Sequence, residues 1–282
     1  MRWATGARVR AEGLALTTGE GPVYTGVDLT ARPGTLTVFR ADSGGGRSAL
    51  LLSLTGRMRP TTGSLYVDGF TLPRQARKVR RLSSLGLMDD VNALEERLRV
   101  REHLTEAVML RNRPAHRGLV DQALDAADVP GIDRDSLTKD LTMLERRRLG
   151  VALALIAEPR LLAVDDVDGG LGPGHQADLW GTLARLAEEG ITVVATCADA
   201  DELEEVRGPL VKGPFPIEQG PDTRPGAGDG DSTSDRTDAS HGTGATATGT
   251  AATPARSGPR SRLSALLRRS ERRGGDRGTS QA

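Results

Sequence analysis

The chain has 282 residues with 38 basic and 38 acidic side chains, so its formal net charge is zero and it has no global field to gather nucleic acid or anionic lipid. Its single cysteine, Cys197, excludes an internal disulfide and leaves a cysteine-based zinc site without support. The longest apolar run, residues 149–157, is far shorter than the roughly 20 residues that cross a bilayer.

The two ends of the chain differ from the middle. No apolar stretch follows the arginines near the start, so we expect no secretory signal and a chain that stays inside the cell. Residues 216–282 are rich in Gly, Asp, Ser, Thr, Ala, Pro and Arg, a composition that buries too little apolar surface to offset the entropy of ordering. We therefore predict one folded domain over residues 1–215 and a disordered tail, in which leucines at helical spacing indicate a short basic helix over 260–273.

The folded region begins with strand patterns. Residues 9–16 and 23–29 alternate apolar and polar side chains, and residues 65–69 end a third such run at a turn, which predicts half-exposed antiparallel strands. A buried strand over 35–40 then runs into a glycine cluster. The apolar density of residues 48–55 predicts a buried helix directly after it.

The rest of the region alternates helix and strand patterns. Residues 119–127 and 149–157 predict helices, and residues 161–166 form a β-run that ends in two acids. Three further elements follow in order: a helix over 179–186, a buried strand over 191–196 and a short acidic helix over 199–206. This alternation predicts a layered α/β domain with a mostly parallel central sheet.

A glycine-rich loop lies between the strand over 35–40 and the helix after it. Residues 41–48 read Ala-Asp-Ser-Gly-Gly-Gly-Arg-Ser, close to the phosphate-loop pattern GxxxxGK[ST]. Three glycines allow successive N–H groups to curl around an anion at a helix N-terminus. Ala41 and Arg47 depart from the pattern, so a plain glycine-rich turn opening a helix is the alternative interpretation.

Several further segments, collinear with this loop, resemble the ABC-type ATPases. The resembling segments are residues 53–63 (LLAGLLxPTSG in the family), 100–104 (TVxEHL), 159–166 (PxLLLLDE), 169–173 (SGLDP) and 191–196 (the strand before the switch histidine). The resemblance implies an α/β fold: a P-loop NTPase core with a mostly parallel central sheet, an antiparallel β subdomain and a helical subdomain over about residues 90–145. It also implies ATP and Mg²⁺, a head-to-tail homodimer or heterodimer, and a separate transmembrane permease subunit. A location at the inner face of the cell membrane follows, with no role for nucleic acid.

The same resemblance assigns the site residues. The residues implied to bind nucleotide are Asp42, Ser43, Gly44, Gly45, Gly46, Arg47, Ser48, Ala49 and, from the signature facing the other subunit's ATP, Thr142. Ser48 and Asp165 are implied to hold Mg²⁺. Asp166, Cys197 and Asp90 fall at or near the family's catalytic glutamate, switch histidine and Q-loop glutamine.

Several of these positions depart from the family. Arg47 keeps the lysine's charge on a bulkier planar group, and Asp166 is one methylene shorter than glutamate. At the signature LSGGQ the chain reads Leu-Thr-Met-Leu-Glu over 141–145, so its glycines are lost, although these side chains have an alternative role in packing. The adenine-stacking aromatic aligns near Thr18, which removes the base's platform unless Tyr24 supplies one.

Two functions remain open from the sequence. The first is a transporter ATPase subunit with slow hydrolysis, and the second is a non-hydrolysing nucleotide-binding adaptor or regulator. Ser48 and Asp165 favour retained binding of Mg-nucleotide, whereas the changes at Asp166, Cys197 and Asp90 favour the second function. The basic run over 74–81 lacks interleaved aromatic residues and is interpreted as a solvated helix face.

Overall fold

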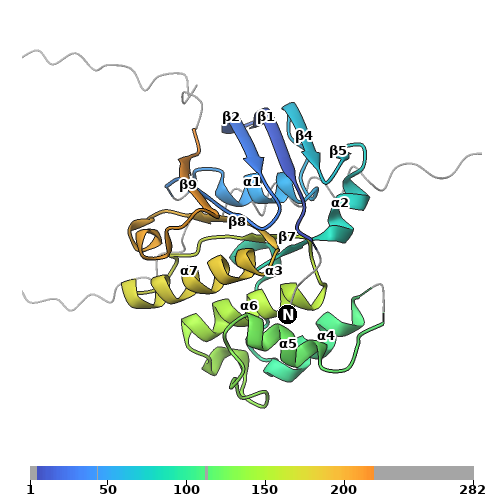
Figure 1. The fold of residues 1–282 in the computed structure, drawn as a ribbon, viewed down its shortest axis with the longest axis vertical. Coiled ribbons are helices and arrows are strands. Elements are labelled where there is room, and N and C mark those ends of the chain that lie inside the picture. The colour runs from blue at the N-terminus through green and yellow to red at the C-terminus, as the bar shows by residue number, and fades with distance from the viewer. Residues whose placement is uncertain (1–4, 43, 112–113, 219–282) are drawn as a thin grey trace, which may run out of the picture.

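The computed structural model describes residues 5–42, 44–111 and 114–218 (Figure 1). Ser43, the side chain of Asp90, most of the predicted tail and its helix over 260–273 lie outside the described residues. The fold continues slightly beyond the expected end at residue 215. The Ile217 N–H donates to the Arg40 carbonyl, and the Thr25 N–H donates to the Glu218 carbonyl.

The antiparallel strands predicted near the start form one sheet. Its strands are β1 (Val9–Thr18), β2 (Gly21–Ala31), β4 (Thr62–Val67) and β5 (Phe70–Leu72), in the order β2-β1-β4-β5. Along β1 the buried side chains are Val9 and Ala11, then Leu14 and Leu16, so the inward spacing changes by one residue at Gly13. Gly13 has φ of +56° and lies at a register irregularity, a β-bulge that keeps the apolar side chains on one face.

The second sheet is parallel throughout and contains the predicted buried strands. Its strands are β6 (Ser83–Leu85), β7 (Leu161–Val164), β8 (Thr192–Cys197), β3 (Leu36–Arg40) and β9 (Val211–Pro216), in the order β6-β7-β8-β3-β9. Because neighbouring parallel strands end at the same edge, the loops after β3, β7 and β8 meet there. This edge positions the candidate site.

The parallel sheet separates two hydrophobic cores. On one face, α1 (Arg47–Leu54) packs between this sheet and the antiparallel sheet, together with Phe39 and Val194. On the other face, α7 (Pro173–Glu188) covers Val38 and Val193, which point the opposite way. The alternation of strand side chains therefore explains why these strands are apolar on both faces.

The remaining helices contribute to both cores. They are α2 (Ala76–Leu82), α3 (Asp89–Asn92), α4 (Val100–Met109), α5 (Leu119–Ala126), α6 (Met143–Ile156) and the 3₁₀ turns at Thr138–Asp140 and Asp201–Val206. Helices α2 and α3 contribute to the core with α1, and α4, α5 and α6 contribute to the core with α7. In Figure 1, α4 and α5 lie with α6 below the parallel strands, opposite the antiparallel sheet. No helix within the described residues is long and apolar enough to span a bilayer. The architecture is the α/β P-loop fold, with parallel sheet, antiparallel sheet and a helical part, that the sequence implies.

Candidate functional site

The glycine-rich loop connects β3 to the N-terminus of α1. Gly44 and Gly46 have φ of +84° and +78°, a region that glycine adopts without a steric penalty. A Cβ on Gly46 would lie 2.5 Å from the Val23 carbonyl oxygen, so this position also excludes a side chain by contact. The first turn of α1 contains no acidic residue, and Ala49 is buried behind it. The loop and helix together present an electropositive backbone end.

Tyr24 lies underneath this loop rather than beside a ligand site. Its ring is fully buried, and its hydroxyl donates to the Ser53 Oγ at 2.7 Å on the inner side of α1. Burial raises the pKa of Tyr24 to about 12. Tyr24 therefore supports α1 from below, and its suggested role as an adenine-stacking platform is wrong because no face of the ring is accessible.

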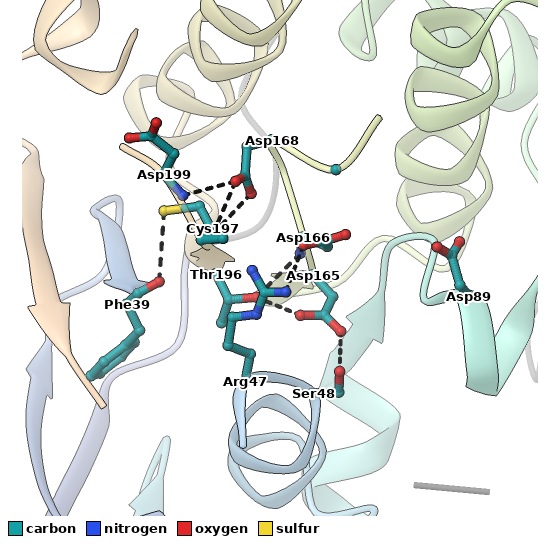
Figure 2. Close-up of polar contacts among 12 residues, drawn as sticks. Phe39, Arg47, Ser48, Asp89, Asp165, Asp166, Asp168, Thr196, Cys197 and Asp199 are labelled. Atoms are coloured by element: carbon teal, nitrogen blue, oxygen red, sulfur yellow. Dashed lines mark hydrogen bonds and ion pairs between the residues drawn. The ribbon is translucent and has the colours of Figure 1, made fainter. Parts of the chain in front are cut away.

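Ser48 and Asp165 meet at the carboxyl edge of the parallel sheet, as Figure 2 shows. The Ser48 hydroxyl donates to Asp165 Oδ2, and the Thr196 hydroxyl donates to Asp165 Oδ1 at 2.5 Å. Asp165 follows β7, Thr196 belongs to β8, and Ser48 lies in the first turn of α1. The structure thus places the two predicted metal ligands in contact, and Thr196 is a partner that the sequence analysis did not name.

Arg47 and Asp166 form an ion pair beside this cluster. An Arg47 guanidinium nitrogen, Nη2, lies 2.8 Å from Asp166 Oδ1, and the Arg47 side chain is only 13% exposed. The other terminal nitrogen, Nη1, is buried and has no hydrogen-bond partner within the described part of the chain. Burial raises the pKa of Asp166 above its ordinary value, and the Arg47 charge opposes this shift.

A third charged residue, Arg147 of α6, reaches the same carboxylate and was missed by the sequence analysis. Its Nη2 donates to the Gly169 carbonyl at 3.2 Å and lies 3.8 Å from Asp166 Oδ2 and 3.7 Å from Asp89 Oδ2. The side chain is 6% exposed. The available signal was the run of three arginines just before an apolar helix, because successive helical positions point to different faces and one of them must point inward.

Cys197 points away from the phosphate loop. Its thiol is fully buried and donates to the Phe39 carbonyl with a sulfur–oxygen distance of 3.8 Å, on the side of β8 opposite to the Thr196 hydroxyl (Figure 2). Burial, with nearby Asp168 as a smaller cause, raises the pKa of the Cys197 thiol to about 12. The thiol therefore lies on the other side of β8 from the Thr196 hydroxyl, because neighbouring strand residues alternate in direction, and the catalytic role of Cys197 stays a prediction.

Asp168 connects two turns at this edge of the site, and the sequence analysis did not name it either. Its carboxylate accepts the Ala198 N–H at 3.0 Å and the Asp199 N–H at 2.8 Å. The turn after β7 is therefore bonded to the turn after β8 (Figure 2). The sequence shows an aspartate after two others, and only the parallel pairing of β7 and β8 gives it these partners.

Thr142 lies apart from the phosphate loop, at the N-cap of α6. Its hydroxyl accepts the Glu145 N–H at 3.2 Å, and the Glu145 carboxylate accepts the Thr142 N–H at 2.9 Å, which forms a capping box. Met143 is exposed, whereas Leu144 packs against the core of the helical part. The alternative role in packing, which the sequence analysis gave for these side chains, thus fits Leu144 but not Met143.

The donors present at the site fit a magnesium–nucleotide complex. Mg²⁺ takes oxygen ligands and usually combines one or two protein oxygens with phosphates and water, which suits the Ser48 and Asp165 pair. No group of three or more His, Cys, Asp or Glu suited to a metal occurs among the described residues. The unpartnered Arg47 Nη1 beside the glycine loop suits a phosphate oxygen.

Comparison with known proteins identifies the family. The profile described as ABC transporter matches residues 24–168, just over half of the chain. The chain belongs to the ABC transporter family. Two relatives in this family are a daunorubicin resistance ATP-binding protein of Streptomyces coeruleorubidus and a sulfate/thiosulfate import ATP-binding protein of Synechococcus elongatus. The first is 30% identical over 67% of this chain and 59% of its own length, and the second is 28% identical over 66% and 54%. The chain thus spans less than two thirds of either relative.

Solved structures of the family share the fold. The cbiO1 protein of Clostridium perfringens, part of an ABC transporter complex, aligns with a TM-score of 0.62 and 21% identity over 78% of this chain and 89% of its own. A dimeric bacterial ABC transporter cassette aligns with a TM-score of 0.61 and 21% identity over 74% and 96%. At this identity the likeness shows the ABC fold alone.

Proposed function

We propose that the chain binds Mg-ATP at the edge formed by β3, β7 and β8 and couples binding to a separate membrane permease. The supporting observation is the buried Arg47 Nη1, which lacks a partner among the described residues and lies beside two glycines of positive φ at a helix N-terminus. A guanidinium and backbone N–H groups gathered in this way bind phosphate oxygens. Because the chain belongs to the ABC transporter family, we infer that these phosphate oxygens belong to ATP.

In this proposal, different residues of the site bind the phosphates and the metal ion. The N–H groups at the start of α1 bind phosphate oxygens, and Arg47 Nη1 adds a charge-assisted donor. Ser48 and Asp165 hold Mg²⁺, which neutralises phosphate charge when it is bound. Thr196 fixes the orientation of Asp165 through its 2.5 Å hydrogen bond.

Calorimetric titration of the full chain with Mg-ATP tests this assignment. We expect saturable binding that falls at least tenfold in Asp165→Ala, because the metal loses its carboxylate, and remains unchanged in Asp125→Ala, an exposed acid on α5. The same titration without Mg²⁺ should give weaker binding. No heat at millimolar Mg-ATP, or equal affinity in wild type and Asp165→Ala, would remove the site.

The second candidate is a nucleotide-binding regulator that does not hydrolyse ATP. It is favoured by the Arg47–Asp166 ion pair, which engages the group at the position of the general base, and by the buried thiol of Cys197. Turnover measured at saturating Mg-ATP separates the two. A slow but magnesium-dependent rate supports the ATPase, whereas binding without any phosphate release supports the regulator.

Coupling to a permease and a position at the inner face of the membrane are part of the proposal. They rest on membership of a family whose solved structures include a protein described as part of a transporter complex and a dimeric cassette. Purification of the tagged chain from host membranes, followed by identification of partners, tests them. Recovery of a multi-span membrane protein together with the chain is expected, and recovery of the chain only from the soluble fraction would count against it.

A further inference from the structure

The Asp166 carboxylate is held between two arginines from different elements. Its Oδ1 lies 2.8 Å from Arg47 Nη2 at the start of α1, and its Oδ2 lies 3.8 Å from Arg147 Nη2 on α6. Both arginines are more than four-fifths buried, so their charges are poorly screened by water. One acid therefore connects two cations that the sequence places far apart.

The backbone holds Asp166 in this position. Asp166 has φ of +51°, its N–H donates to the Thr196 Oγ1 at 3.2 Å, and its carbonyl accepts the Gly169 N–H at 2.9 Å. A Cβ on Gly169 would lie 2.0 Å from Asp166 Oδ2 and 2.9 Å from Arg147 Nη2. The carboxylate and the Arg147 guanidinium thus fill the place of a side chain at residue 169.

The two arginines differ in what else they contact. Arg147 also donates to the Gly169 carbonyl and lies 3.7 Å from the exposed carboxylate of Asp89, so it keeps partners without Asp166. Arg47 has Asp166 as its ion-pair partner, and its Nη1 has none within the described residues. Arg47 is therefore the arginine that a phosphate would separate from Asp166, whereas Arg147 would stay beside Asp166.

We propose that Asp166 is the counter-ion of Arg47 in the nucleotide-free chain and competes with phosphate for it, and that Arg147 is a positioning residue that retains Asp166 when a nucleotide takes Arg47. This inference rests on the proposed Mg-ATP site. Asp166 occupies Nη2 and leaves Nη1 without a partner among the described residues, so a phosphate that takes both terminal nitrogens of Arg47 must displace the carboxylate from Nη2. Arg147 favours binding by lowering the cost of separating Asp166 from Arg47.

The proposal predicts opposite effects for the acid and for Arg147. Asp166→Asn keeps the shape and tolerates positive φ, but it removes the competing charge, so Mg-ATP affinity should rise about threefold to tenfold. Arg147→Met should lower affinity by a similar factor, because Asp166 then has Arg47 as its remaining close cation. Arg148→Met, the adjacent arginine that pairs with Asp128, should leave affinity unchanged.

The double variant separates this positioning role from a merely structural one. In the Asp166→Asn background, Arg147→Met should change Mg-ATP affinity by less than about twofold, because the charge that Arg147 retains is gone. A purely structural role through Gly169 and Asp89 would give the same loss in both backgrounds. Thermal unfolding of every variant checks that each is folded at the temperature of the titration.

The outcomes distinguish the inference from the function on which it rests. Wild-type binding with no gain in Asp166→Asn, or an Arg147→Met effect that is equal in both backgrounds, overturns the inference and leaves the Mg-ATP site standing. No binding by wild type or by Asp166→Asn overturns both.

Discussion

At the scale of single residues, backbone conformation limits what can be substituted. Asp166 is one of four residues other than glycine with positive φ within the described chain, and its side chain fills the space over Gly169. Aspartate tolerates this conformation better than glutamate, which lacks a short side chain that can bond locally. The shorter acid at this position is thus matched to the local backbone.

Restoring the family's glutamate should therefore fail. We expect Asp166→Glu to destabilise the chain by about 1 kcal/mol, because of the positive φ and the crowding against Gly169. We also expect turnover to stay below about 1 s⁻¹, since the added methylene does not separate the acid from Arg47. Urea unfolding and phosphate release measure the two effects. A stable variant with tenfold faster turnover would show that the missing methylene was the defect.

The two loop glycines offer a matched test of strain against contact. Gly44→Ala meets only the cost of positive φ, because no atom of the described residues beyond its chain neighbours lies within 4 Å of the added Cβ, and we expect a loss of about 1 kcal/mol. Gly46→Ala adds a Cβ at 2.5 Å from the Val23 carbonyl, so its loss should be clearly larger, about 2 to 4 kcal/mol. Equal urea midpoints for the two variants would contradict the packing of the loop on β2.

The residues that make up each motif could be predicted from the sequence, but the directions of their side chains could not. Ser48 and Asp165 could be assigned because each follows directly from a local pattern in which neighbours set the position. The direction of the Cys197 thiol could not be predicted, because it depends on strand register, where a shift of one residue reverses the side chain. Arg147 could not be paired from sequence, since Asp166 and Asp89 reach it only through the tertiary fold.

At the scale of elements, α6 begins with a cap whose atoms are already bonded to each other. The Thr142 hydroxyl accepts the Glu145 N–H, and the Glu145 carboxylate returns to the Thr142 N–H. This arrangement stabilises a helix start that exposes Met143. A contribution of Thr142 to nucleotide bound by another subunit remains a prediction from family resemblance.

The cap predicts a stability effect that needs no nucleotide. Thr142→Ala should lower the free energy of unfolding by about 1 kcal/mol, because the Glu145 N–H loses its acceptor. Thr142→Ser keeps the hydroxyl and should be close to wild type. Urea unfolding without ATP measures both variants. A Thr142→Ala variant of unchanged stability would mean that the capping bond contributes nothing.

The strands β6 and β9 were not predicted from the sequence, each for its own physical reason. β6 has only three residues, two of them serines, and carries no alternation to recognise. β9 contains Pro214 and Pro216, which are compatible with a strand only because β9 lies at the edge of the sheet. Long buried strands such as β8 were predictable because burial on both faces leaves a continuous apolar run.

At the scale of the whole molecule, the helical part presents an apolar surface away from the candidate site. Met109 and Leu110, at the end of α4, are 77% and 74% exposed. These two side chains are therefore a position at which contact with another protein can be tested. Tyr66, exposed by 42%, belongs to β4 of the antiparallel sheet, which lies at the opposite end of the molecule from α4 (Figure 1), and it provides a control position.

If this surface meets the proposed permease, polar substitution should weaken the complex. We expect Met109→Ser combined with Leu110→Ser to reduce recovery of the membrane partner at least fivefold, without changing Mg-ATP affinity. Tyr66→Ser should not change recovery. Quantitative pull-down from host membranes measures the effect. Unchanged recovery of the partner would place its contact elsewhere on the chain.

The two hydroxyl groups beside Asp165 both donate their protons to its carboxylate. The Asp166 N–H donates to the Thr196 hydroxyl oxygen, and the Thr196 hydroxyl donates its proton to Asp165 Oδ1. The Ser48 hydroxyl donates its proton to Asp165 Oδ2. Thr196 is held from both sides, whereas Ser48 is free to turn its hydroxyl. A cation between Ser48 and Asp165 requires a lone pair where Ser48 now presents a proton. A bound cation would therefore require the Ser48 hydroxyl to rotate, whereas the Thr196 hydroxyl would keep its bond to Asp165 Oδ1.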